Sequence, residues 1–64
     1  MPLYMVVRSR NGSAAAVFFD DKATAYDHFT DMWTGWNDFD RIQLYEYYQG
    51  RYILIRDVKK EGNL

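Results

Sequence analysis

Residues 40–58, DRIQLYEYYQGRYILIRDV, decide the fold class that we expect for this 64-residue chain. The stretch consists of two alternating segments that meet at Gln49-Gly50, a pattern typical of two antiparallel strands joined by a tight turn. Alternation sends successive side chains to opposite faces of a sheet. One face receives Ile42, Leu44, Ile53 and Ile55, and the other receives Tyr45, Tyr47, Tyr52 and Leu54. Both faces of this hairpin are therefore apolar, although a single helix can cover only one of them.

A second hairpin is predicted over residues 3–19, because Asn11-Gly12 is the preferred centre of a type I′ turn. The pairs expected on one face are Met5 with Phe18 and Val7 with Ala16, and those on the other are Tyr4 with Phe19 and Val6 with Val17. We expect the face that contains Met5 to join the core. The face that contains Tyr4 is expected to extend the tyrosine face of residues 40–58.

Residues 21–34, between the hairpins, predict one amphipathic helix. Asp20 or Asp21 is a suitable N-cap, since a carboxylate accepts the unpaired N–H groups of the first turn, and Gly35 can end the helix. The apolar side chains fall within an arc of about 120°. They are Ala25, Tyr26, Phe29, Met32 and Trp33, with Trp36 just beyond. Asp27 and Asp31 lie on the opposite side, and Asn37-Asp38 forms the loop to the third strand.

Together these elements predict an α+β two-layer sandwich of order ββαββ, in which one helix covers a four-stranded antiparallel sheet. The domain spans residues 1–58, and residues 59–64 form a polar tail. The expected core is formed by Leu3, Met5, Val7, Phe18, Ile42, Leu44, Ile53 and Ile55, beneath Tyr26, Phe29, Trp33 and Trp36. The order of the strands in the sheet stays open.

The composition excludes several classes of protein. The chain has no cysteine, which rules out disulfides and cysteine zinc sites, and its formal net charge of −1 does not favour general nucleic-acid binding. No apolar run approaches the roughly 20 residues that span a bilayer, and the N-terminus lacks the pattern of a secretory signal. We therefore expect a cytoplasmic protein that makes no contact with a membrane.

No pattern of residues predicts catalysis. His28, the single histidine, lies on the helix beside Asp27 and Asp31, but a metal site needs further strong ligands. Phosphate-binding glycine loops and nucleophile motifs are lacking from the sequence. We expect a protein that is not an enzyme and that uses no metal or cofactor.

The uncovered aromatic face of the sheet is the first candidate binding site, and its residues are Tyr4, Phe19, Tyr45, Tyr47 and Tyr52. Tyrosine is enriched at protein interfaces, and a large apolar patch on a monomer marks a contact surface. A partner protein is the leading hypothesis, and a homodimer that pairs two such faces is an alternative. A second alternative is single-stranded nucleic acid stacked on the same rings beside Arg8, Arg41 and Arg56. The lack of an excess of basic residues makes nucleic acid the less favoured partner.

The second candidate binding site is acidic, and its residues are Asp27, Asp31, Asp38 and Asp40. A row of carboxylates can imitate the phosphates of nucleic acid and attract a basic surface on a larger protein. In size, aromatic content and acidic helix, the chain resembles small phage or mobile-element proteins that block a host enzyme, although no motif identifies a family. We therefore expect a regulator or inhibitor of a larger protein, such as one that handles nucleic acid.

Overall fold

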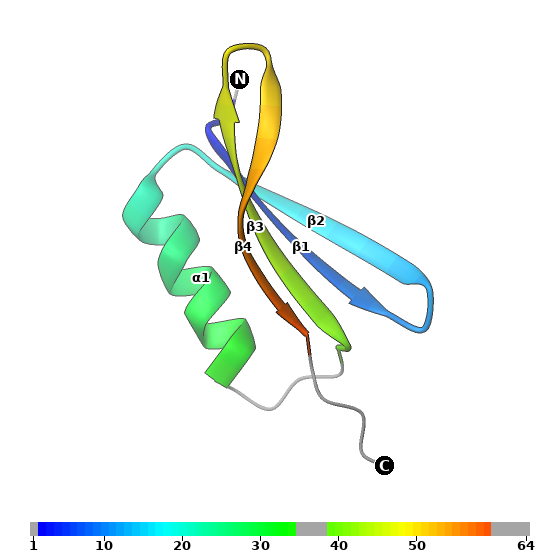
Figure 1. Ribbon diagram of the computed structural model, residues 1–64. Coiled ribbons are helices and arrows are strands. Elements are labelled where there is room, and N and C mark those ends of the chain that lie inside the picture. Colours follow the sequence, from blue (N-terminus) through cyan, green and yellow to red (C-terminus); the bar gives the residue numbers. More distant parts are fainter. Residues whose placement is uncertain (1, 35–38, 60–64) are drawn as a thin grey trace.

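The computed structural model describes residues 2–34 and 39–59. Its elements are β1 (Tyr4–Arg10), β2 (Ser13–Phe19), α1 (Lys22–Thr34), β3 (Arg41–Tyr48) and β4 (Arg51–Lys59). The strands form one antiparallel sheet in the order β2-β1-β3-β4, and α1 packs across one face of it (Figure 1). The predicted ββαββ two-layer fold is confirmed. The predictions for Gly35, Trp36, Asn37, Asp38 and residues 60–64 fall outside the described residues, whereas Lys59, which the sequence assigned to the tail, ends β4.

Both hairpins turn through two residues with positive φ. Asn11 and Gly12 have φ values of 49° and 85°, and Gln49 and Gly50 have values of 49° and 89°. Positive φ at both central positions is typical of the type I′ turn, whose twist matches that of the flanking strands. The turn at Asn11-Gly12 sets the predicted register of β1 against β2, with Met5 opposite Phe18.

The carboxylate of Asp21 caps α1, as one of the two alternatives from the sequence predicts. Its Oδ2 accepts hydrogen bonds from the Thr24 backbone N–H at 2.8 Å and from the Thr24 hydroxyl at 2.9 Å. These bonds, the backbone one first, lower the pKa of Asp21. Because the folded state holds the proton less tightly than the unfolded state, the cap stabilises the fold above pH of about 4 and loses this effect as the pH falls.

The pairing of β1 with β3 places Tyr4 and Val6 beneath α1, so the prediction for the two faces of the first hairpin was wrong. Val6 lies opposite Leu44, and paired residues of neighbouring strands point to the same face of a sheet. Tyr4 is 7% and Val6 2% exposed. A shift of one residue in a register exchanges the two faces of a strand, and the sequence left the pairing of β1 open.

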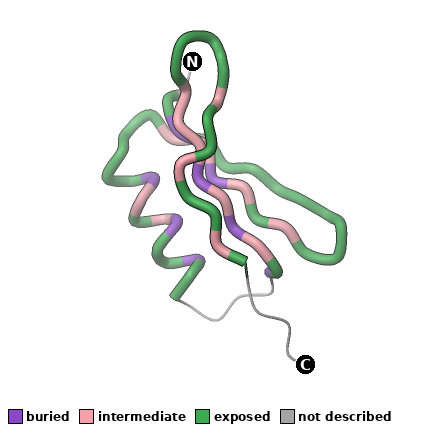
Figure 2. The backbone as a smooth tube through the Cα atoms, viewed as in Figure 1, coloured by how far each residue is buried: buried purple, intermediate pink, exposed green. Residues whose placement is uncertain are grey.

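The core consists of one sheet face and the inner side of α1 (Figure 2). Its buried residues are Tyr4, Val6, Ala25, Phe29, Met32, Phe39, Ile42 and Leu44, and Phe19, Tyr26, Ile55 and Val58 pack against them. Leu3, Met5, Val7 and Phe18, which were expected in the core, lie on the other face of the sheet. Trp33, expected to cover the core, is 47% exposed. The buried Phe39 was not predicted.

A bulge in β4 changes the direction of its side chains partway along the strand. Leu44 lies opposite Arg56 and Tyr45 lies opposite Leu54, which leaves Ile55 as the extra residue. Leu54 therefore faces away from α1, whereas Arg56 faces it. The guanidinium of Arg56 lies over the ring of Tyr26 on α1, 5.8 Å from its centroid. The prediction that Arg56 lies on the uncovered face was wrong, because strict alternation does not anticipate a bulge.

Threonine substitutions at two neighbouring valines test the assignment of the faces. Val6→Thr introduces a hydroxyl at a site that is 2% exposed, and we expect it to lower the free energy of unfolding by about 1–3 kcal/mol. Val7→Thr makes the same chemical change on the uncovered face, and we expect a change of less than about 0.5 kcal/mol. Urea unfolding followed by circular dichroism measures both. Equal losses at the two positions would contradict the assignment.

Candidate functional site

The sheet face that α1 does not cover, here called the open face, carries a continuous apolar cluster. Its residues are Leu3, Met5, Val7, Phe18, Tyr45, Tyr47, Tyr52 and Leu54. The cluster crosses all four strands, from β2 at one edge to β4 at the other. Its most exposed side chains are Phe18 at 50%, Leu3 at 46% and Leu54 at 43%. The open face is therefore an apolar surface in contact with water.

Tyr52 holds the aromatic part of the open face together. Its ring lies 5.2 Å from that of Tyr47 in an edge-on arrangement and 6.0 Å from that of Phe18, a distance range in which aromatic pairs attract each other. The Tyr52 hydroxyl donates a hydrogen bond to the Pro2 carbonyl oxygen at 2.7 Å. These contacts link β4 to β2 and to Pro2, two residues before β1, so the rings are ordered before any partner arrives.

An ion pair between Arg41 and Asp57 lies on the same side of the sheet, at the opposite end of β4 from Tyr52. Arg41 Nε donates to Asp57 Oδ1 at 2.9 Å, and Nη2 donates to Oδ2 at 2.7 Å. This two-point hydrogen bonding lowers the pKa of the Asp57 carboxyl and raises the pKa of Arg41. The pair gives the open face a rim in which the charge of Arg41 is balanced.

Three of the five predicted aromatic site residues lie on the open face and two do not. Tyr45, Tyr47 and Tyr52 are on it, as predicted. Tyr4 is instead buried under α1, where its hydroxyl donates to Glu46 Oε2 at 3.1 Å, and burial is the main cause of its raised pKa. Phe19 also lies on the helix side, with its ring 5.0 Å from that of His28. Their placement follows from the pairing of β1 with β3.

Four residues of the open face were not predicted to lie there: Leu3, Met5, Val7 and Phe18. The charge of Arg8 favours the wrong face, because Arg8 shares a face with Tyr4 and Val6 and a charged side chain suggests contact with water. That signal is misleading because a face beneath a short helix can accommodate a charged residue at its end. The first hairpin therefore contributes three aliphatic side chains and the ring of Phe18 to the open face, in place of the expected Tyr4 and Phe19.

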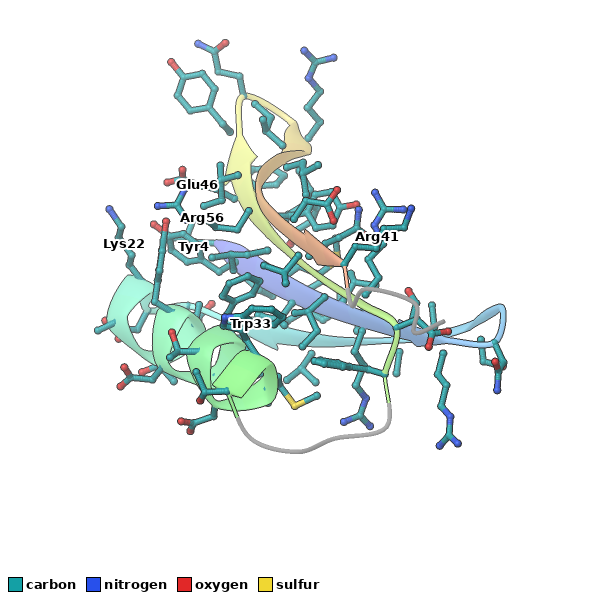
Figure 3. All side chains as sticks on the ribbon, turned by 60° about the horizontal axis from the view of Figure 1, so that its bottom comes forward. Tyr4, Lys22, Trp33, Arg41, Glu46 and Arg56 are labelled. Carbon is teal, nitrogen blue, oxygen red and sulfur yellow. The ribbon has the colours of Figure 1, made fainter. Side chains whose placement is uncertain are left out.

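The three arginines proposed for nucleic-acid binding do not gather on one face. Arg8 is paired with Ile42 on the helix side, and Arg56 lies with Lys22 around the ring of Tyr26. Figure 3 shows Arg56 near Tyr4 and Lys22, whereas Arg41 lies apart from them. Only Arg41 of the three lies on the open face, where Asp57 binds it.

The predicted acidic site is divided between separate parts of the molecule. Asp27 and Asp31 are exposed on α1, as predicted. Asp40 lies immediately before β3, where its Oδ2 accepts a hydrogen bond at 2.9 Å from the backbone N–H of Asn11 in the first turn. Asp38 lies outside the described residues. Asp40 therefore has a structural contact of its own, and the acidic surface that the helix presents consists of Asp27 and Asp31.

Within residues 2–34 and 39–59, no three or more His, Asp or Glu side chains come close enough together to hold a metal ion. No helix in this part of the chain is long and apolar enough to cross a membrane.

Replacing Arg41 tests the rim of the open face. In the native chain we expect the Asp57 carboxyl to titrate below its usual range, and in Arg41→Gln we expect its pKa to rise toward the ordinary value of an aspartate, because the charged donor is gone. Asp21 is the control, since Thr24 rather than Arg41 lowers its pKa. Nuclear magnetic resonance titration of the carboxyl carbons measures both groups. An unchanged Asp57 pKa in the variant would mean that the pair does not form in solution.

The open face, its rim and the exposed aspartates of α1 are the features of this chain from which a function can be inferred. The open face is a large apolar surface with ordered rings. At its rim Asp57 balances the charge of Arg41, and the aspartates give the opposite layer a negative potential. No protein-family model, curated protein or solved structure matches the chain.

Proposed function

We propose that this chain is a small, non-enzymatic protein-binding module whose open face binds a partner protein. The observation that carries the proposal is the continuous apolar cluster over all four strands, with Phe18 and Leu54 half exposed. A surface of this kind on a monomer is typical of a contact site. Tyrosine contributes a large contact area and loses little conformational entropy, which suits Tyr45, Tyr47 and Tyr52 to binding.

Charge favours a protein over nucleic acid as the partner of the open face. Binding to single-stranded nucleic acid draws much of its affinity from basic side chains that neutralise phosphates. Arg41 is bound by Asp57, and Arg8 and Arg56 lie on the helix side. None of these three arginines is thus free on the open face to bind a phosphate, and the net charge of the chain is −1.

The exposed Asp27 and Asp31 give the proposed module a preference for partners with a basic surface. Negative charge speeds the encounter with such a partner, an effect that salt weakens. A chain of this size that occupies a basic surface would act as a regulator or inhibitor of a larger protein. The apolar contact and the charge effect lie on opposite layers, so they can be tested separately.

Serine substitutions at two adjacent residues of β4 test the open face. Leu54 is on the open face and 43% exposed, whereas Ile53 is on the helix side and 37% exposed. We expect proteins from a lysate of the source cells to bind immobilised native chain and Ile53→Ser, and to bind Leu54→Ser at least about tenfold less tightly. Calorimetry with the purified partner then measures the three affinities.

Three outcomes would contradict the proposal. A partner that binds all three proteins equally would show that the open face is not its site. Binding of a thymine oligonucleotide that weakens steeply with salt would favour the nucleic-acid hypothesis. A dimer of the native chain that Leu54→Ser converts to monomer would assign the face to pairing with a second copy.

The double variant Asp27→Asn and Asp31→Asn tests the charge effect. We expect its association rate with the partner to fall at low salt, by about tenfold or less. The dissociation rate should stay nearly the same, because exposed charges outside the contact act mainly on the encounter. Stopped-flow fluorescence at low and high salt measures the rates. Equal association rates for the native chain and the variant at low salt would remove the aspartates from the proposal.

A further inference from the structure

The two edges of the sheet differ in how they are protected. The β4 edge carries Arg51, Arg56, Asp57 and Lys59 together with the bulge at Ile55, devices that hinder the addition of another strand. The β2 edge, SAAAVFF, has no charged residue and no proline in its seven residues, and it is exposed along nearly its whole length (Figure 2). Figure 1 shows the β1–β2 turn extending away from α1. The β2 edge is therefore open to another strand.

The hydrogen-bonding groups at this edge can be assigned from those of β1. The carbonyl oxygens of Leu3 and Ser9 accept bonds from Tyr47 and Asp40, so the odd-numbered residues of β1 direct their backbone groups toward β3. The even-numbered residues of β1 consequently bond to the odd-numbered residues of β2. The N–H and C=O groups of Ala14, Ala16 and Phe18 are left pointing outward, away from β1.

We infer that β2 pairs antiparallel with β2 of a second copy of this chain, with Ala16 opposite Ala16 across a two-fold axis. Ala14 of each copy then lies opposite Phe18 of the other, and this register pairs all the outward groups of both strands. A shift by two residues leaves groups of Phe18 or Ala14 unpaired. The β2 edge is thus self-complementary, as a two-fold symmetric contact requires.

The side chains of β2 are also complementary in this register. Small residues fill the first half of the strand and large ones the second, so Phe18 is placed opposite Ala14, and Val17 is placed opposite Ala15. Phe18 and Val17 are 50% and 39% exposed in the single chain. Ser13, Ala14 and Ala15 line a hollow of about 170 Å³ together with neighbouring residues of β1. The hollow leaves room beside Ala15, where Val17 of the second copy is placed.

The dimer goes beyond the proposed function and does not depend on it. Paired residues of antiparallel strands point to the same face, so both helices lie on one side of an extended sheet and both open faces on the other. An edge contact alone is smaller than the roughly 1,200–2,000 Å² of stable interfaces, so the association is expected to be weak. Two adjacent open faces would bind a two-fold partner with increased avidity.

Cysteine cross-linking tests the register, because the chain has no cysteine of its own. In a hydrogen-bonded pair the Cα atoms lie about 5.5 Å apart, within the range that a disulfide spans. We expect Ala16→Cys to form a disulfide-linked dimer under mild oxidation, and Ala14→Cys and Phe18→Cys each to do so at least about tenfold more slowly. An equimolar mixture of the last two should form the mixed dimer. Equal cross-linking rates for all three variants would overturn the register.

Sedimentation equilibrium tests the dimer itself. We expect the mass of the native chain to rise toward that of a dimer with concentration, and Ala16→Pro to stay monomeric with an unchanged circular dichroism spectrum, since the lost N–H points outward. Ala16→Glu keeps that N–H and places two carboxylates opposite each other, so it should also stay monomeric. Leu54→Ser, on the far edge, should dimerise normally, which separates this contact from pairing of the open faces. A native chain that stays monomeric up to about 1 mM would overturn the inference.

Discussion

The antiparallel pairing of β1 with β3 is the interaction on which the rest of the structure depends. It joins two hairpins that are otherwise held by local turns, and it places Val6 opposite Leu44. Hydrogen bonds from Tyr47 to Leu3 and from Asp40 to Ser9, 2.8 and 2.7 Å long, lie at its two ends. This one register decides which face of the first hairpin meets α1, and therefore which residues remain for contact with another molecule.

The bulge at Ile55 has a similar effect on charge. Strict alternation from Leu54 onward would place Arg56 on the open face and Asp57 beneath the helix. The extra residue reverses both, so Arg56 reaches the ring of Tyr26 and Asp57 reaches Arg41. The open face therefore combines apolar area with a rim at which Asp57 binds Arg41, a composition more typical of protein contacts than of phosphate binding.

The sequence was sufficient wherever the controlling interactions are local. The turns at Asn11-Gly12 and Gln49-Gly50 and the cap at Asp21 depend on neighbouring residues, and with them the element order follows. It was insufficient where two distant segments meet. Tyr4 and Phe18 are both apolar and lie on opposite faces of their hairpin, so alternation alone offers two equivalent solutions. Tyr45, Tyr47 and Tyr52 were placed correctly because they share one hairpin with the aliphatic residues that define the core.

The two tight turns also have a consequence for the route by which the chain folds. Hairpins with such turns form in about 1–10 μs, because they need contacts only between neighbouring segments. The union of β1 with β3 must close the much longer segment that contains α1, so it is expected to be the late and rate-limiting event. Before that event the apolar faces of both hairpins are exposed to water, and the uncharged β2 edge is accessible to other chains. The interval before the hairpins join is thus when this chain is most prone to aggregate.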